Sequence, residues 1–509
     1  MKRKVYIALA IAMCIVAVFF LLPAKEPGRS TPAKQEAPIF PDYSSVTLPY
    51  NIAPINFMVE DGAEKVIATF SSKSGKKIVV KSSNNKIEIP IQAWKKLLNA
   101  NKGNDLIITI YSKKKGSAWV KYPSITNYIS SDEIDSHIVF RHISAGYILW
   151  EKMGIYQQNI ETSEKKPILL NDRTNRNCMN CHTFGNYDPQ KMLIHLRSKP
   201  GGTILYNNSE AKLLNTKTPF TMSSCVYPAW HPNGKAIAFS VNIIEQKFHS
   251  AGNEAINVYD KSSDLVVYDV EKNMITTTPT ISTSSMENLP SWSPDGKYLY
   301  YISAPAQRGQ NDSLKTRYDL LRIPYSYEQN TWGLADTLLR SSDTGLSITF
   351  PEVSPDGRFI VFCMADQGYF SVHYTSSDLY IMDIATREYS KLSINSDHVE
   401  SFHYWSSNSK WLMFISKRLD NLYSRVYFTH IDEKGNASKP FLMPQTDPET
   451  NRTLNLNYNR PVFVNGEVTI SPASLAEVAN ESPVDVKFDP SVNIDALSGA
   501  TRYAGKTVH

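Results

Sequence analysis

The sequence predicts a mainly β protein whose larger part is a propeller of five or six blades, and two observations support this prediction. First, short runs of β-branched and aromatic residues, separated by turn-forming residues, recur through most of the 509 residues. Second, from Gly201 onward these runs repeat at intervals of roughly 50 to 60 residues, with four strands expected in each unit. Units of four strands at such a period are typical of propeller blades. We also expect a small β-sandwich and a short helical module to precede the propeller.

The chain begins with a positively charged segment that leads into an apolar run. Lys2, Arg3 and Lys4 precede the uncharged residues 5–22, a length near the lower limit for crossing a bilayer. The run ends without the small residues of an evident cleavage site. We therefore expect residues 1–22 to be a membrane anchor, with a cleaved signal sequence as the alternative. Because positive charges remain inside, the rest of the chain is predicted to lie in the periplasm, tethered to the lipid bilayer or released by cleavage.

Two regions separate the apolar segment from the rest of the chain. Residues 23–44 are rich in Pro, Lys and Ser and are expected to form a linker. Residues 45–130 contain short β-type runs such as VIATF, KIVVK and DLIITIYS between polar turns, with one short helix expected at IQAWKKLLNA. This second region is predicted to be the small β-sandwich, and it shows no pattern of chemically active residues.

Four segments of the propeller region align with one another. They are YPAWHPNGKAIAFSVN (227–242), LPSWSPDGKYLYYISA (289–304), FPEVSPDGRFIVFCMA (350–365) and FHYWSSNSKWLMFISK (402–417). Each segment reads as a strand, a turn and a second strand. The turn aspartates are expected to form turns, and Trp230, Trp292 and Trp405 to pack the blades. Residues 201–214 read as half of another blade, and the strand around 458–464 is expected to help close the ring.

The SPDG turns of these segments resemble those of TolB-type propellers, which have WD40-like repeats. The motif is present at 293–296 and 354–357, and HPNG and SSNS at 231–234 and 406–409 are degenerate copies. The resemblance covers about residues 201–445 and implies a propeller, which we extend over 201–484, followed by a C-terminal tail at 485–509. A propeller by itself implies binding or assembly and not a reaction.

Residues 131–200 contain the one motif that predicts chemistry, the sequence CMNCH at Cys178, Cys181 and His182. Two thiols three positions apart, followed directly by an imidazole, are the attachment signature of a c-type haem. Cys178 and Cys181 are predicted to form the thioether bonds, and His182 to be the proximal ligand of the iron. A zinc site, a disulfide and a redox pair are the alternatives, although zinc would need a second pair of ligands. The remaining cysteines are single: Cys14, Cys225 and Cys363.

The sixth ligand of the predicted iron is expected from a short helix at 189–197. Asp188 is a suitable N-cap and Pro189 a suitable first helical residue. Met192 and His195 would then share one face of the helix, and either would complete the coordination. The position is alternatively vacant, or filled by a more distant residue such as Met153, Met222, His249 or His373. Charged residues near the motif are expected to pair with the haem propionates or to lie in solvent: Arg173, Arg176, Arg197 and Lys199.

Together these features resemble membrane-anchored periplasmic cytochromes with a propeller body. We expect a c-type cytochrome with one covalent haem that transfers electrons, with the propeller as docking surface for a redox partner in the membrane or periplasm. The alternatives are a haem enzyme with an open iron site and a TolB-like binding scaffold without redox function. No catalytic residue is assigned, because no nucleophile triad, carboxylate pair or phosphate loop is evident. The net charge of +5 is small for this length, and no basic stripe with aromatic residues indicates nucleic-acid binding.

Overall fold

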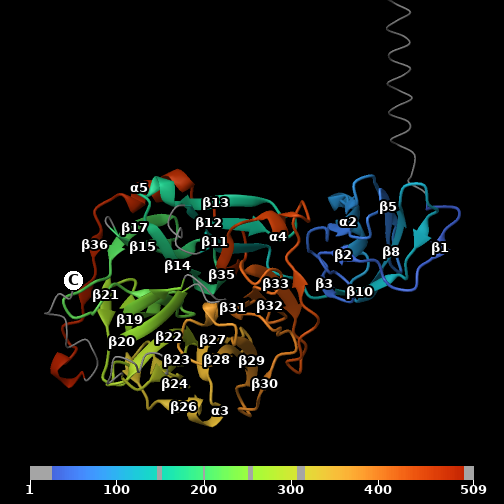
Figure 1. Ribbon diagram of the computed structural model, residues 1–509. Helices are drawn as coiled ribbons and strands as arrows, with labels where there is room; N and C mark the ends of the chain where they lie inside the picture. The colour runs from blue at the N-terminus through green and yellow to red at the C-terminus, as the bar shows by residue number, and fades with distance from the viewer. Residues whose placement is uncertain (1–25, 146–151, 199–200, 250–255, 307–315, 498–509) are drawn as a thin grey trace, which may run out of the picture. The chain divides into compact units, whose positions relative to one another are not determined.

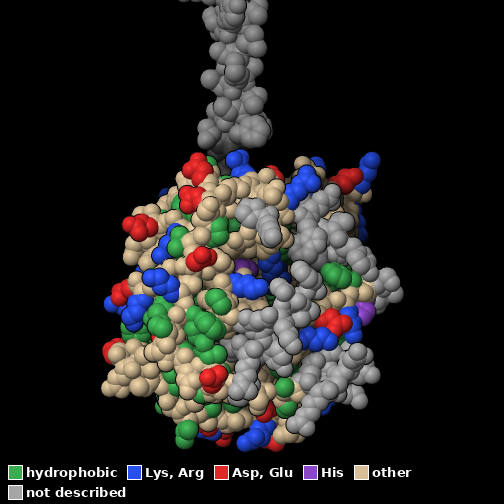
Figure 2. Space-filling model, turned by 90° about the vertical axis from the view of Figure 1, so that its left-hand side faces the viewer, with side chains coloured by type: hydrophobic (Ala, Val, Ile, Leu, Met, Phe, Trp, Pro, Cys, Tyr) green, Lys and Arg blue, Asp and Glu red, His purple; other side chains and the backbone are tan. Residues whose placement is uncertain are grey.

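The computed structural model describes residues 26–145, 152–198, 201–249, 256–306 and 316–497 (Figure 1). The chain divides into two compact units. We call them the N-terminal unit (residues 1–131 with 444–449) and the propeller unit (residues 132–443 with 450–509). On the face shown in Figure 2, acidic and basic side chains are interspersed, and no area of one sign dominates it.

The N-terminal unit contains two β-sheets and one helix among its described residues. The larger sheet has the order β1-β9-β8-β10-β3, with β5 paired to β8 and β6 paired to β5. Its strands are β1 (Thr31–Pro32), β3 (Thr47–Pro49), β5 (Lys65–Ser71), β6 (Ile78–Ser82), β8 (Asn104–Lys113), β9 (Val120–Lys121) and β10 (Ile125–Ser130). The smaller sheet has the order β2-β4-β7, with β2 (Ile39–Phe40), β4 (Phe57–Val59) and β7 (Lys86–Ile87).

Two predictions for this region can be compared with the structure. The helix expected at IQAWKKLLNA is α2 (Ile91–Asn99), and it buries Trp94, Leu97 and Leu98 on one face. That spacing is the one an amphipathic helix requires. The residues expected to be a linker instead supply β1 and β2, so the β-structure begins earlier in the chain than the composition suggested.

The propeller unit contains six sheets among its described residues. Three of them include strands from the ends of the chain. The first has β35 (Asn457–Val464), β11 (His137–Ile143), β12 (Met153–Asn159) and β13 (Lys165–Leu170). The second has β14 (Cys178–Phe184), β15 (Lys191–Arg197), β16 (Gly202–Asn207), β17 (Glu210–Asn215) and β36 (Val484–Asp485). The third has β18 (Val226–Trp230), β19 (Ala236–Phe248), β20 (Ile256–Asp269), β21 (Met274–Thr276) and β37 (Lys487–Phe488).

The other three sheets follow in chain order. The fourth has β22 (Met286–Trp292), β23 (Tyr298–Ala304), β24 (Asp319–Ser326), β25 (Thr331–Trp332) and β26 (Asp336–Leu339). The fifth has β27 (Ser347–Val353), β28 (Phe359–Ala365), β29 (Asp378–Asp383) and β30 (Tyr389–Lys391). The sixth has β31 (Glu400–Trp405), β32 (Trp411–Ser416), β33 (Arg425–His430) and β34 (Phe441–Leu442). The described α-helices of this unit are α3 (Ser341–Thr344), α4 (Thr450–Thr453) and α5 (Pro472–Ala479).

One strand of each sheet faces the centre of the unit, and we call these six the inner strands: β14, β18, β22, β27, β31 and β35. Each inner strand contacts the next one, and β31 contacts β35, which in turn contacts β14. β35 comes from the C-terminal part of the chain and pairs with β11, so one sheet combines strands from both ends of the unit. This is the arrangement of a β-propeller, and residues 458–464 lie at the position expected from the sequence.

The inner strands share one local irregularity. The strand pairing shifts near the middle of each, as a β-bulge does. At that point each strand has one residue with a left-handed backbone: Cys181, Tyr227, Leu289, Phe350, Phe402 and Arg460. Counting from this bulge residue therefore identifies equivalent positions in all six sheets. Trp230, Trp292 and Trp405 are equivalent by this count, and all three are buried, as the packing role requires.

The described residues of 131–200 do not form the expected helical module, and this prediction was wrong. The described residues of this range form β11 to β15, which belong to the first two sheets of the propeller. The predicted helix at 189–197 is strand β15, paired with β14 on one side and with β16 on the other. Asp188 and Pro189 form the turn before it, in which the Asp188 side chain accepts a hydrogen bond from the Gln190 N–H at 2.9 Å. Pairing on both edges outweighs the weak local preference for a helix.

The predictions for the two ends of the chain can be compared with the structure to different extents. Part of the segment expected to be a tail belongs to the propeller, where β37 adds an edge strand to the third sheet. The anchor predicted at 1–22 lies outside the described residues. Within the residues that the structure describes, no helix is long and apolar enough to cross a membrane.

Candidate functional site

The CMNCH motif lies on β14, the inner strand of the second sheet (Figure 1). Cys178 begins the strand, and both cysteines are buried with free thiols. Cys181 is the bulge residue, with a φ of 49°. The other inner strands have aromatic, aliphatic or arginine side chains at this position. Cys181 thus has the smallest of the six side chains at this repeated position.

His182 bridges the second sheet to the first. Its Nε2 lies 3.3 Å from the carbonyl oxygen of Val139 on β11. The imidazole also hydrogen bonds to the backbone of Arg460 on β35. The side chain is 2% exposed. Burial lowers the pKa of His182 to about 3, so the imidazole is neutral and Nε2–H is the donor.

The same bridge is made once more in the ring. His403 occupies the equivalent position on β31, and its Nε2 lies 2.9 Å from the carbonyl oxygen of Val361 on β28. The imidazole of His403 likewise hydrogen bonds to the backbone of Phe350, the bulge residue of the preceding inner strand. The other four inner strands have proline here: Pro228, Pro290, Pro351 and Pro461. The contacts of His182 thus have a structural explanation within the propeller.

A buried arginine lies against the motif. Arg141 on β11 is 7% exposed. Its Nη1 donates to the carbonyl oxygen of Met179 at 2.6 Å and to the Asn180 side chain at 3.3 Å, and its Nη2 donates to the Asn459 side chain at 2.8 Å. All three acceptors are neutral, and its Nε is buried without a partner. No ion pair to Arg141 occurs among the described residues.

The electrostatics of this arginine are unusual for the chain. Burial lowers the pKa of Arg141, and the nearby groups Cys178 and Cys181 oppose that shift. Arg425 is also fully buried, but each of its side-chain nitrogens donates a hydrogen bond, and Asp420 lies 3.9 Å away. Arg141 therefore places a cation without a neutralising carboxylate beside the two thiols, and burying such a charge costs free energy of folding.

The Cys178 thiol is not activated. Burial raises the pKa of Cys178, and Arg141 and Arg197 reduce that rise. Of the two remaining described cysteines, Cys225 directly precedes β18 and Cys363 lies on β28 of the fifth sheet. No group of three or more His, Cys, Asp or Glu side chains arranged for a metal is found in the described part of the chain. A zinc site at the motif thus has no set of ligands there.

Of the predicted distal ligands, Met192 and His195 are separated by the strand geometry. His182 is opposite Ile194 in the pairing of β14 with β15. Because side chains alternate along a strand, Met192 lies on the face of the sheet that His182 occupies, and His195 lies on the other face. His195 is held there by Thr203, 3.0 Å from its Nδ1. The structure therefore does not bring His182 and His195 together.

Met153 is the more distant candidate that the structure does bring to the motif. The backbone N–H of Met179, between the two cysteines, donates to the Met153 sulfur at 3.2 Å. Met153 belongs to β12 of the first sheet, and it packs in the same core as Cys178 and Met192. Its thioether therefore lies on the side of β14 toward which His182 points.

A polar cluster lies beside Cys181 in the interior of the propeller. The hydroxyl groups of Tyr227 and Tyr369 are 3.5 Å apart. The Tyr318 hydroxyl donates to the Asp260 carboxylate at 3.0 Å, and the rings of Tyr318 and Tyr369 are 6.1 Å apart. Burial raises the pKa of Asp260 to about 6. Asn242 and Asn288 also donate to the Asp260 carboxylate, at 3.0 and 2.6 Å, so this part of the interior is polar.

The donor set around the motif fits a covalently held haem in its chemistry. It offers two thiols, an adjacent imidazole, a second sulfur at Met153 and a buried cation at Arg141 whose charge is not neutralised. Two features require local rearrangement before such a group is held. His182 is engaged with the Val139 carbonyl, and neither Cys178 nor Cys181 lines the cavity among the inner strands or the one beside Trp332.

Comparisons with known proteins concern the architecture alone. No family model matches the chain, and no curated protein matches it. Among solved structures, TolB from Acinetobacter baumannii is 12% identical, over 71% of this chain and 79% of that one, with a TM-score of 0.42. A chain of a nidogen–laminin complex is 10% identical, over 65% of this chain and 100% of that one, with a TM-score of 0.38. The Dos1 propeller is 14% identical, over 45% and 64%, with a TM-score of 0.28. None of these likenesses bears on what this chain binds.

Two features of the site were not found by reading the sequence. Arg141 is 37 positions before the motif, and nothing in its local sequence indicates that β11 lies beside β14. The equivalence of His182 and His403 was hidden because the repeat was followed only from Gly201. Extending the alignment of inner strands upstream to CHTF would have shown that the motif occupies a blade position.

Proposed function

We propose that this protein is a c-type cytochrome that carries one covalent haem and transfers electrons. The observation that carries the proposal is the spacing of Cys178, Cys181 and His182, on a strand where both thiols are buried beside the cation of Arg141. The haem, when bound, supplies one-electron chemistry. Cys178 and Cys181 would hold it through thioether bonds, and His182 would turn from the Val139 carbonyl to bind the iron.

The residues around the motif would serve electron transfer in two ways. The burial of the cysteines keeps water from this part of the inner strand, so nearby charges act strongly. Arg141 would stabilise the reduced haem relative to the oxidised haem, because its cation is not neutralised by a carboxylate. Met153 and Met192 lie on the side of His182 and are the preferred candidates for the sixth ligand, whereas His195 lies on the other face.

The proposal extends to location and partners. Residues 1–22 would anchor the chain in the lipid bilayer, with the body in the periplasm, where c-type haems are attached. The propeller would serve as the docking surface for a redox partner protein. Support comes from the charged and apolar pattern of the first 22 residues.

A second candidate function is a binding scaffold without a redox group, and the contacts of His182 favour it. His182 and His403 make matching bridges between sheets, although only His182 follows a cysteine pair. In that case Cys178 and Cys181 are packing residues or form a disulfide. A haem enzyme remains a variant of the first proposal, with an open iron site.

The test is an absorption spectrum of the full chain made together with c-type haem attachment machinery. The matched control is the double variant C178A/C181A, purified in the same way. A reduced α-band in wild type, resistant to denaturation and absent from the control, supports a covalent haem. If added carbon monoxide leaves that band unchanged, the iron is saturated and serves electron transfer; a shifted band indicates an enzyme. Absence of haem in the wild type refutes the proposal and leaves the scaffold.

A further inference from the structure

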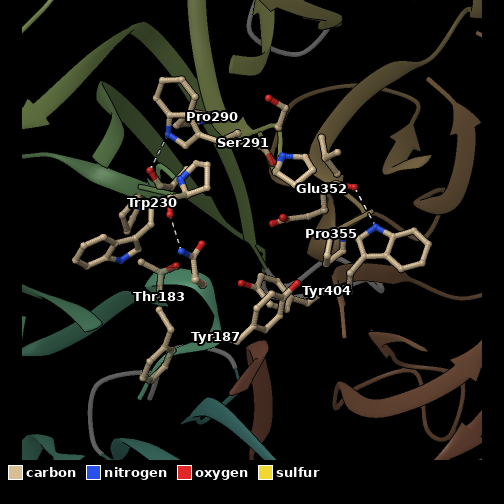
Figure 3. Close-up of a pocket in the computed structure, with 18 of the residues that line it drawn as sticks. Thr183, Tyr187, Trp230, Pro290, Ser291, Glu352, Pro355 and Tyr404 are labelled. Atoms are coloured by element: carbon tan, nitrogen blue, oxygen red, sulfur yellow. Dashed lines mark hydrogen bonds between the residues drawn. The ribbon is translucent and has the colours of Figure 1, made fainter. Parts of the chain in front are cut away.

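A cavity of about 450 Å³ opens where the inner strands end, beyond their bulge residues. Figure 3 shows side chains that converge on it from different sheets, with Glu352 pointing inward across from Trp230 and Thr183. Much of its wall is proline and tryptophan. The volume lies within the range of sites that hold small organic ligands. The cavity is lined by neither cysteine of the motif, so what it binds is a separate question from the haem.

The charged groups of the cavity are Glu352 and Arg460. Glu352 precedes the last residue of β27, and Arg460 is the bulge residue of β35. A single contact of 3.5 Å joins the Arg460 Nη2 to a Glu352 carboxylate oxygen, and each side chain is about one-fifth exposed. This is longer than a well-formed ion pair between such groups. Arg460 lines the cavity, and this contact involves only one of its side-chain nitrogens.

The groups around Glu352 determine whether its carboxyl is protonated or ionised. Burial raises the pKa of Glu352 to about 7, and Arg460 alone opposes this shift. Tyr404 on β31 and Tyr187 after β14 lie nearby, with their rings 5.7 Å apart. The pKa of each phenol is raised by burial, so both stay neutral, and Asp135 acts on both tyrosines. The Glu352 carboxyl is thus close to half protonated near neutral pH.

One further donor in the wall lacks an acceptor. The Trp292 and Trp405 indole N–H groups donate at 3.1 Å to the carbonyl oxygens of Ala229 and Glu352, each in the preceding sheet. The equivalent N–H of Trp230 is buried without a partner. When Glu352 is protonated, the net charge of the cavity is positive, because Arg460 is then its only charged group.

We propose that this cavity binds a small organic carboxylate, whose oxygens accept hydrogen bonds from Arg460 while its hydrocarbon part packs on the proline and tryptophan wall. An anion is favoured when Glu352 is neutral, because Arg460 is then the only charge in the cavity. Ionised Glu352 competes for the same guanidinium and repels the ligand. Binding is thus linked to uptake of one proton, and the affinity falls as pH rises through the pKa of Glu352.

Calorimetric titration with three probes of one shape tests the proposal: benzoate, benzamide and benzylammonium, each at pH 6 and pH 8. We expect benzoate to bind, with an affinity about tenfold higher at pH 6 than at pH 8, the change in the protonated fraction of a group with a pKa near 7. Benzamide and benzylammonium should bind more weakly at pH 6. Tighter binding of benzylammonium, benzoate affinity independent of pH, or no binding of any probe overturns the proposal.

Two variants make the test specific. Glu352→Gln copies the protonated carboxyl, so benzoate should bind at both pH values with the affinity of wild type at pH 6. Arg460→Leu should lower the affinity for benzoate at least tenfold. We expect this variant to fold, because Leu289 occupies the equivalent position in β22. The control is Arg358→Gln, which breaks an exposed ion pair with Glu433 and should leave binding unchanged. If Arg460→Leu binds as wild type does, the proposed recognition is wrong.

Discussion

His182 and His403 stand at the same position of two inner strands, and each directs its Nε2 to the carbonyl oxygen of the second strand in the preceding sheet. Four other sheets have proline there. The repeat therefore tolerates proline at this position, and the two histidines are alternatives to it. This relationship offers a way to separate a structural role of His182 from a role in holding iron.

We expect His182→Pro and His403→Pro to fold, each with a free energy of unfolding lower by about 1 kcal/mol. Each variant loses hydrogen bonds worth about 1 kcal/mol apiece, and proline returns part of this through the unfolded chain. Urea unfolding measures the change. In haem-loaded protein, only His182→Pro should convert a low-spin spectrum to a high-spin one. An unchanged spectrum in His182→Pro would show that His182 is not the ligand.

Arg141 should raise the reduction potential of a haem held by the motif. Its guanidinium is buried against Met179 and is not neutralised by a carboxylate. Removing a cation from a poorly screened position favours the oxidised state. We expect Arg141→Met to lower the potential by roughly 60 mV, a tenfold change in a one-electron equilibrium.

The measurement is a spectroscopic redox titration, and two variants control it. Arg141→Lys keeps the charge and should restore most of the potential. Arg176→Gln removes an exposed arginine near the motif and should change the potential little, because water screens that charge. A potential that responds equally to Arg141→Met and Arg176→Gln would contradict a special role for the buried cation.

The propeller could be predicted from the sequence because its signal is local and repeated. Each strand–turn–strand segment can be recognised in the sequence by alternating apolar residues around a Pro-Asp-Gly turn. The structure has these hairpins at the expected places. The strand at 458–464 was also anticipated, because a ring needs a partner for its first sheet.

The failure at 131–200 has a physical cause. CMNCH suggested a separate module, and Asp188-Pro189 is as good a start for a helix as it is for a turn. The pairing of β15 with its neighbours β14 and β16 decided the outcome, and such pairing cannot be read from a seven-residue segment alone. The same reason hid Arg141, whose importance depends on which sheet packs beside the motif.

The sixth ligand can be assigned by comparing Met153 with His195. The Met153 sulfur accepts a hydrogen bond from the Met179 N–H, on the side of β14 toward which His182 points. His195 lies on the opposite face of the sheet. We expect haem-loaded Met153→Leu to bind carbon monoxide, because a coordination position opens while the core volume is nearly kept. His195→Gln retains a partner for Thr203 and should resist carbon monoxide as wild type does. Carbon monoxide binding by His195→Gln alone would reverse the assignment.

Glu287 should make the stability of the propeller depend on pH. It lies two positions before the bulge residue of β22 and is 2% exposed. Burial raises its pKa to about 7, above the usual value of 4.5, although Thr283 hydrogen bonds to the carboxylate. The folded state therefore binds the proton more tightly than the unfolded state does between pH 4.5 and 7. The free energy of unfolding must fall as pH rises through this window.

Glu287→Gln should remove that part of the dependence. We expect the variant to be more stable than wild type at pH 8, by up to about 3 kcal/mol, and the difference to vanish near pH 4.5. The comparison is urea unfolding at both pH values. Glu400 provides the matched control: it holds the equivalent position in β31, but it pairs with Arg418 at 2.8 Å. Glu400→Gln leaves that arginine without its partner and should be less stable than wild type at pH 8. A Glu287→Gln variant that is destabilised equally at both pH values would mean that the carboxylate contributes through its hydrogen bonds with Thr283 and not through its protonation.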